Sequence, residues 1–234
     1  MKIKAILFDK DGTLIDVNRT WIPLYREMLS SEFKVSPDVA DELLARAGYD
    51  KTSDSFFAGS TLAGGTTKQL VGIWWPELNV KEQAAKALHI DRHYAPLARQ
   101  YLKPLMDLAP VFTALQSLGL RLGVATNDSA FSATGQMKKL AVDHFFDSII
   151  GADSVEVPKP SGQMIVRFAK SAGVHPSEIA MVGDNIHDLE EAKNGGAGLG
   201  IGVLTGNAMR HDIEHAADHV LESVAELPRF FGAR

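Results

Sequence analysis

Apolar residues gather in five short runs along this chain, at 5–8, 120–125, 148–150, 179–182 and 199–203. None of the runs alternates cleanly between apolar and polar residues, as a strand with one face in water would. Runs of this length and character are typical of parallel strands that are covered on both faces. We therefore predict five buried strands of a parallel sheet.

Helical spacing of apolar residues fills the intervals between these runs, at 111–118, 129–140, 161–172 and 188–194. Glycine follows most of these stretches directly, as it often does where a helix ends. Strands and helices that alternate with short connections predict an α/β fold with an open, parallel, Rossmann-like sheet.

The interval between the first and second predicted strands carries almost no strand pattern, and helical spacing recurs in it at 21–33, 38–47 and 83–102. We predict a mostly helical cap domain at 17–102, inserted into an α/β core domain made of 1–16 and 103–234. Ligands of open α/β sheets bind at the carboxyl ends of the strands. Because the insert begins just past the first of these ends, we expect it to cover the site as a lid.

Composition narrows the classes of protein that the chain can belong to. Its formal net charge is −5, from 24 basic and 29 acidic residues, which argues against a nucleic-acid-binding surface. It has no cysteine, so disulfides, thiolate metal sites and a cysteine nucleophile are excluded. It shows neither a signal peptide nor an apolar run of the ~18 residues that span a membrane. We expect a cytoplasmic protein that binds neither membrane nor nucleic acid.

The first predicted strand ends in two carboxylates, Asp9 and Asp11, which Gly12 and Thr13 follow directly. Two carboxylates at a strand end, beside a turning backbone, can hold a divalent cation. Taken by itself, the pattern fits an aspartate that caps a turn equally well. Lys10 lies between the two aspartates, and we expect it to point away from both and to have no catalytic role.

Three more strand ends carry polar side chains. Thr126 and Asn127 follow the second strand, where a hydroxyl and the next backbone N–H can bind a phosphate oxygen. Lys159 stands between two prolines, which stiffen the backbone around it. Asp184 and Asp188 are four residues apart at the start of a predicted helix, so they lie on one face. We expect the intervening His187 to be an exposed turn residue.

The four motifs in this order resemble those of the haloacid dehalogenase (HAD) superfamily, which consists mostly of phosphatases. The resemblance covers the whole chain, including the helical cap. It implies that Asp9 is the nucleophile that becomes an aspartyl-phosphate and that Asp11 is the general acid and base. It also implies that Thr126, with Asn127 beside it, binds the phosphate, and that Lys159 steadies the nucleophile and the phosphoryl group.

The same resemblance implies a Mg²⁺ site. Its ligands would be Asp9, Asp184 and the backbone carbonyl of Asp11, with Asp188 as a supporting acid in the first or second shell of the metal. A metal ion also makes chemical sense at this site. A carboxylate that attacks a phosphate dianion is repelled by it, and nearby positive charge offsets that repulsion.

The resemblance leads us to expect a Mg²⁺-dependent phosphatase that hydrolyses a small organic phosphate monoester, most like the phosphoglycolate phosphatases. The dehalogenases of the superfamily lack the second aspartate and need no metal, so Asp11 argues against that reaction. A sugar-phosphate mutase similar to β-phosphoglucomutase remains an alternative, as does a non-catalytic binding protein on the same fold. The expected partner is a small phosphorylated metabolite, and the expected assembly is a monomer or a homodimer.

Overall fold

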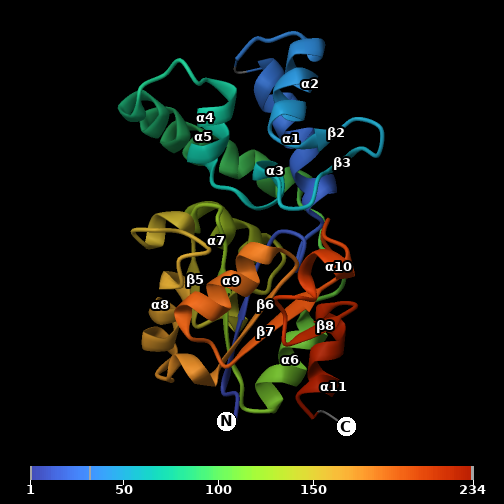
Figure 1. Cartoon of the computed structure of the whole chain (residues 1–234), viewed down its shortest axis with the longest axis vertical. Helices are drawn as coiled ribbons and strands as arrows, with labels where there is room; N and C mark the ends of the chain where they lie inside the picture. Colours follow the sequence, from blue (N-terminus) through green and yellow to red (C-terminus); the bar gives the residue numbers. More distant parts are fainter. Residues whose placement is uncertain (1, 32, 233–234) are drawn as a thin grey trace.

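The computed structural model describes residues 2–31 and 33–232, which form a sheet-containing core below a helical cap (Figure 1). In this described part, the core contains a six-stranded sheet in the order β5-β4-β1-β6-β7-β8. All neighbouring strands are parallel. The strands are β1 (Ala5–Phe8), β4 (Arg121–Ala125), β5 (Ser148–Ile150), β6 (Ile179–Gly183), β7 (Leu199–Val203) and β8 (His219–Leu221). The open parallel α/β sheet predicted from the sequence is confirmed.

Helices cover both faces of the sheet. The core helices are α6 (Ala109–Ser117), α7 (Ala130–Lys139), α8 (Gln163–Ala172), α9 (Ile186–Gly195), α10 (Arg210–Ile213) and α11 (Leu227–Phe230). Ile6 and Phe8 of β1 belong to a buried cluster that also contains Phe112 of α6. Leu7 of the same strand packs on the opposite face in a cluster with Phe168 of α8. This two-sided burial explains why the strand sequences do not alternate.

The cap is inserted between β1 and β4 and is mostly helical, as expected. Its elements are α1 (Val17–Ser31), α2 (Pro37–Arg46), β2 (Tyr49–Asp50), β3 (Ser55–Phe56), α3 (Thr61–Gly64), α4 (Thr67–Trp74) and α5 (Val80–Tyr101). The cap has a core of its own, in which Leu24, Met28, Leu44 and Val71 are fully buried. Residue 32, within the helix predicted at 21–33, lies outside the described residues.

Local sequence signals set the beginnings of the cap helices. Asn79 and Glu82 form a capping box at α5, and Thr66 and Gln69 form one at α4, so at both helix starts side chains accept hydrogen bonds from backbone N–H groups that the helix itself leaves free. Pro37 occupies the first turn of α2, where its missing N–H costs nothing. Within the described ranges, no helix combines the length and apolar character needed to cross a membrane.

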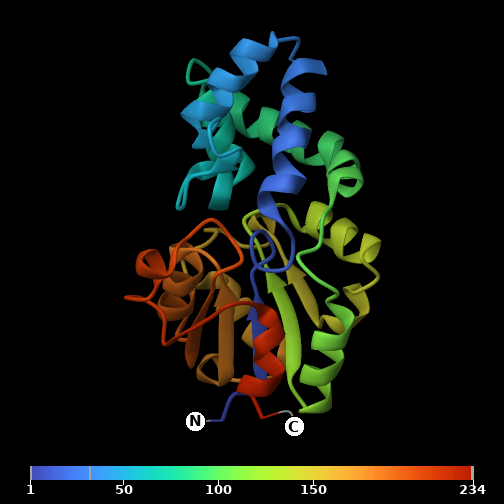
Figure 2. The same ribbon diagram turned by 90° about the vertical axis from the view of Figure 1, so that its right-hand side faces the viewer.

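The cap stands over the carboxyl ends of the sheet strands, while both chain termini lie at the opposite end of the core (Figure 2). The long helix α5 runs down to the core and packs against α7. A direct hydrogen bond of 2.8 Å joins the Asn127 amide of the core to the Gly64 carbonyl of the cap. The cap is therefore placed to enclose whatever binds at the strand ends.

Candidate active site

A tight turn after β1 brings carboxylates from distant parts of the chain together. Gly12 adopts a positive φ of 86°, and a Cβ at that position would lie 2.4 Å from Asp184 Oδ2. Gly206 also approaches this oxygen, and a Cβ at that position would lie 1.7 Å from it. The Thr13 hydroxyl donates to Asp184 Oδ1 over 3.0 Å. Only glycine allows the backbone this close to the Asp184 carboxylate.

Three buried carboxylates and one ammonium form the centre of the site. Carboxylate oxygens of Asp9, Asp184 and Asp188 lie within 4.8 Å of one another. The Lys159 ammonium lies 2.5 Å from Asp9 Oδ1 and 2.6 Å from Asp188 Oδ1. It also donates to the Ala125 carbonyl over 3.0 Å. Residues from four separate segments of the sequence thus meet at one point.

The charges at this centre do not balance. Burial raises the pKa of Asp9 to about 7 despite the opposing charge of Lys159, and it raises the pKa of Asp184 well above its ordinary value. For Lys159, burial alone would lower the pKa, but Asp188 and Asp9 outweigh it and raise the pKa. Three carboxylates against one ammonium leave an excess of negative charge. A divalent cation that prefers oxygen ligands fits this donor set.

The loop that carries Lys159 is held by Asn127. The Asn127 side chain accepts a hydrogen bond from the Lys159 backbone N–H over 3.1 Å, and its amide donates to the Lys159 carbonyl over 3.3 Å. Thr126 is buried beside it, at the end of β4. The structure therefore brings every site residue expected from the sequence to the same edge of the sheet.

Lys10 corrects one expectation, because it does not point away from both aspartates. Its side chain is fully buried, and its ammonium lies 2.9 Å from Asp11 Oδ2 and 2.9 Å from Asp128 Oδ2. It also donates to Gln136 Oε1 over 2.5 Å. The Trp21 indole of the cap donates to the other oxygen of Asp11. Lys10 and Trp21 together fix the orientation of the Asp11 carboxylate.

The ion pairs of Lys10 yield a testable prediction. Burial alone would lower the pKa of Lys10, but Asp11 and Asp128 outweigh it and raise the pKa, so the ammonium stays charged. Lys10→Met leaves Asp128 buried without a cation, and we expect it to lower the free energy of unfolding by ~3 kcal/mol in urea titrations. The double variant with Asp128→Asn should regain most of that loss. An equal loss in both variants would contradict the pairing.

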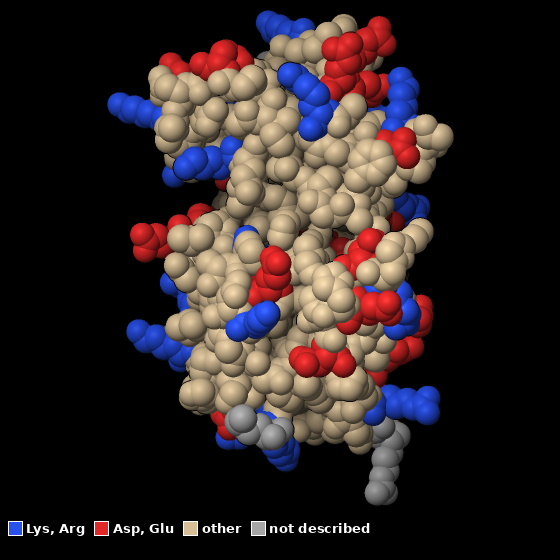
Figure 3. All heavy atoms as spheres, in the orientation of Figure 1, with Lys and Arg blue, Asp and Glu red and all other residues tan. Residues whose placement is uncertain are grey.

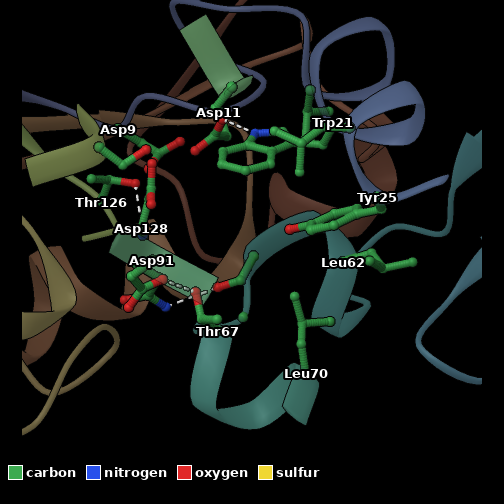
Figure 4. Close-up of a pocket in the computed structure, with 18 of the residues that line it drawn as sticks. Asp9, Asp11, Trp21, Tyr25, Leu62, Thr67, Leu70, Asp91, Thr126 and Asp128 are labelled. Carbon is green, nitrogen blue, oxygen red and sulfur yellow. Dashed lines mark hydrogen bonds between the residues drawn. The ribbon is translucent and has the colours of Figure 1, made fainter. Parts of the chain in front are cut away.

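The cap supplies the wall of the cavity that faces these residues (Figure 4). Trp21 and Tyr25 of α1, Thr67 of α4 and Asp91 of α5 line it. His187 lines it from the core, which corrects the expectation of an exposed turn residue. Its side chain is half-buried, and its Nδ1 atom is buried with no hydrogen-bond partner among the described residues. No local sequence pattern indicated that Trp21, Tyr25 or Asp91 belongs to the site.

Comparison with known proteins identifies the family. The family model of haloacid dehalogenase-like hydrolases matches residues 3–196. The chain belongs to this family. A solved structure of a HAD phosphatase from Thermococcus onnurineus superposes with a TM-score of 0.68 at 23% identity and covers 99% of both chains. This HAD hydrolase therefore has the fold of the family, with a helical cap inserted into the α/β core.

Curated relatives of this HAD hydrolase are phosphatases with different substrates. A pyrophosphatase PpaX from Halalkalibacterium halodurans is 27% identical over 100% of this chain and 99% of its own. A glyceraldehyde 3-phosphate phosphatase from Methanopyrus kandleri is 27% identical, with coverages of 83% and 81%. A phosphoglycolate phosphatase from Shigella boydii is 26% identical, with coverages of 88% and 85%. The family implies a small phosphorylated substrate.

Proposed function

We propose that the protein is a Mg²⁺-dependent phosphatase that hydrolyses a small organic phosphate monoester through an aspartyl-phosphate on Asp9. One observation carries the proposal: the Lys159 ammonium is shared between Asp9 and Asp188, beside Asp184. The Lys159 ammonium thus lies against the carboxylate of Asp9. The neighbouring carboxylates, Asp184 and Asp188, can help Asp9 to hold a second cation, a metal ion. A carboxylate can attack a phosphate only where such positive charge offsets the repulsion between them.

In the first half of the proposed reaction, an oxygen of Asp9 attacks phosphorus and the bond from phosphorus to the alcohol oxygen breaks. Asp11, in its protonated form, gives its proton to that oxygen, so the alcohol leaves neutral. In the second half, a water molecule attacks phosphorus and Asp11 takes its proton. The bond to Asp9 breaks, inorganic phosphate leaves, and both aspartates are restored. Dividing the reaction in this way replaces one difficult step with two easier ones.

The remaining residues hold the phosphoryl group. Thr126 follows β4 at the floor of the cavity, and its hydroxyl with the backbone N–H of Asn127 is our candidate for binding a phosphate oxygen. Lys159 would neutralise charge on the nucleophile and the phosphoryl group together. Asp9, Asp184 and the Asp11 carbonyl would hold Mg²⁺, with Asp188 in support. When bound, the ion would neutralise charge that develops on the phosphoryl oxygens.

Removing divalent cations tests this proposal. We expect EDTA to abolish hydrolysis of p-nitrophenyl phosphate and excess Mg²⁺ to restore it. We also expect Mg²⁺ to stabilise the fold by ~2.7 kcal/mol at one hundred times its dissociation constant, because it binds the native carboxylates only. Thermal unfolding measures this second effect without turnover. Asp184→Asn should weaken the stabilisation, whereas Glu190→Gln, on the exposed face of α9, should not. Turnover that EDTA does not affect would contradict the metal assignment.

A further inference from the structure

The space between cap and core has two connected parts. The inner part is a cavity of about 70 Å³ that contains Asp9 and Lys159 in its wall. The outer part is a groove of about 900 Å³ between α4 and α5 of the cap and the 152–161 segment of the core. It lies on the side where the outline of the molecule is notched between its two halves (Figure 3). A leaving group larger than the inner cavity must extend toward this groove.

Two cap residues lie where the inner cavity meets the outer groove. Among the described residues of the cap, Thr67 and Asp91 line both the inner cavity and the outer groove. The Thr67 hydroxyl donates to Asp91 Oδ1 over 2.5 Å, as Figure 4 shows. Within the described part of the chain, no residue donates to the second oxygen of Asp91 and none forms an ion pair with it. That oxygen is available to a ligand.

The surroundings of Asp91 are negative. The pKa of Asp91 is raised to about 6, mainly by burial and to a lesser extent by the charges of Asp128 and Asp153, while the hydrogen bond from Thr67 lowers it. The carboxyl is thus mostly ionised at pH 7. Lys159 is the single lysine or arginine among the described residues that line the inner cavity, and it is already paired with Asp9 and Asp188. The imidazole of His187 lines the cavity as well, from the core side.

The rest of the cap wall carries no charge of its own. Its described lining residues are largely aromatic and aliphatic, and they include Trp21, Tyr25, Leu62, Leu70 and Ile90. Burial raises the pKa of the Tyr25 hydroxyl well above its ordinary value, so it remains a neutral phenol. It points into the cavity in Figure 4. Arg19 of α1 is exposed to solvent and is not among the residues that line the cavity. In the groove, Lys68 is an exposed cation, and the two acidic residues Asp153 and Glu156 line the same groove and offset its charge.

We infer that Asp91, positioned by Thr67, selects phosphate monoesters whose leaving alcohol carries a hydroxyl or ammonium group and no acidic group. The inference rests on the proposed phosphatase function. A hydroxyl or ammonium can donate to the unused oxygen of Asp91, whereas a carboxylate or phosphate there would face a like charge with no cation between them. The leaving groups of pyrophosphate and 2-phosphoglycolate are anions of the kind that this wall disfavours.

Three substrates of nearly equal size test the inference: 2-hydroxyethyl phosphate, O-phosphoethanolamine and 2-phosphoglycolate. We expect kcat/KM with saturating Mg²⁺ to be about tenfold or more higher for the first two than for the third. Asp91→Asn keeps an acceptor for Thr67 but removes the charge. It should reduce the ratio of kcat/KM for the first two substrates to kcat/KM for 2-phosphoglycolate by about tenfold. Glu42→Gln makes the same exchange on an exposed face of α2 and should leave the ratio unchanged.

The outcomes separate this inference from the proposed function. Hydrolysis of p-nitrophenyl phosphate together with equal use of all three substrates would overturn the selection by Asp91 and leave the phosphatase intact. An unchanged ratio in Asp91→Asn would overturn it as well. If neither p-nitrophenyl phosphate nor any of the three esters is hydrolysed in the presence of Mg²⁺, the proposed function fails and the inference fails with it.

Discussion

Asp9→Asn is expected to lower kcat on p-nitrophenyl phosphate by roughly four to six orders of magnitude, because it removes the atom that forms the covalent intermediate. The fold should survive this change. Asp9 is one of three buried carboxylates grouped at the site, and the Lys159 ammonium that it shares with Asp188 remains paired with Asp188 in the variant. We therefore expect a free energy of unfolding equal to that of the wild type or higher.

Both measurements are needed to assign the nucleophile. Steady-state kinetics gives the loss of activity, and urea unfolding followed by circular dichroism gives the stability. Glu190→Gln makes a matched exchange of acid for amide on the exposed face of α9 and should change neither. Substantial activity in Asp9→Asn, or inactivity that accompanies unfolding, would contradict the role given to Asp9.

Lys159→Met is expected to reduce both stability and activity. The variant leaves Asp9 and Asp188 buried without their cation, and breaking such a buried pair costs ~3–5 kcal/mol of unfolding free energy. We expect kcat/KM to fall at least ~100-fold, because the ammonium no longer offsets charge in the transition state.

A second variant separates these two effects. Lys159→Met combined with Asp188→Asn removes one of the unpaired charges, so urea unfolding should show that much of the stability returns while the activity does not. Lys170→Met, an exposed lysine in the last turn of α8, serves as the matched control and should leave both unchanged. Activity that recovers together with stability would show that Lys159 acts only on the fold.

The core and its site were predictable because the chemistry follows the strands directly. Each central strand is apolar on both faces, so its sequence marks where it ends, and Asp9, Thr126 and Asp184 come immediately after those ends. Parallel strands place their carboxyl ends along one edge of the sheet. The edge strand β8 was missed because it is three residues long and partly exposed. The hairpin strands β2 and β3 have two residues each, too few to show a period.

The contacts made by Lys10 and by the cap could not be predicted in the same way. Strand alternation placed Lys10 away from the aspartates, but β1 ends at Phe8, so the turn rather than the strand sets its direction. Its long side chain then reaches both Asp11 and Asp128. Trp21 and Asp91 reach the site only because of how the cap helices pack on the core. No local sequence pattern around Trp21 or Asp91 predicts this packing.

Chemical trapping of the intermediate tests the central claim most directly. The wild-type protein would be mixed with Mg²⁺ and p-nitrophenyl phosphate, quenched during turnover and treated with borohydride, which reduces an aspartyl-phosphate to homoserine. Peptide mass spectrometry then locates the modified residue. We expect homoserine at position 9, and none at that position when either Mg²⁺ or substrate is omitted. Turnover without any modification of Asp9, or with the modification at another carboxylate, would contradict this claim.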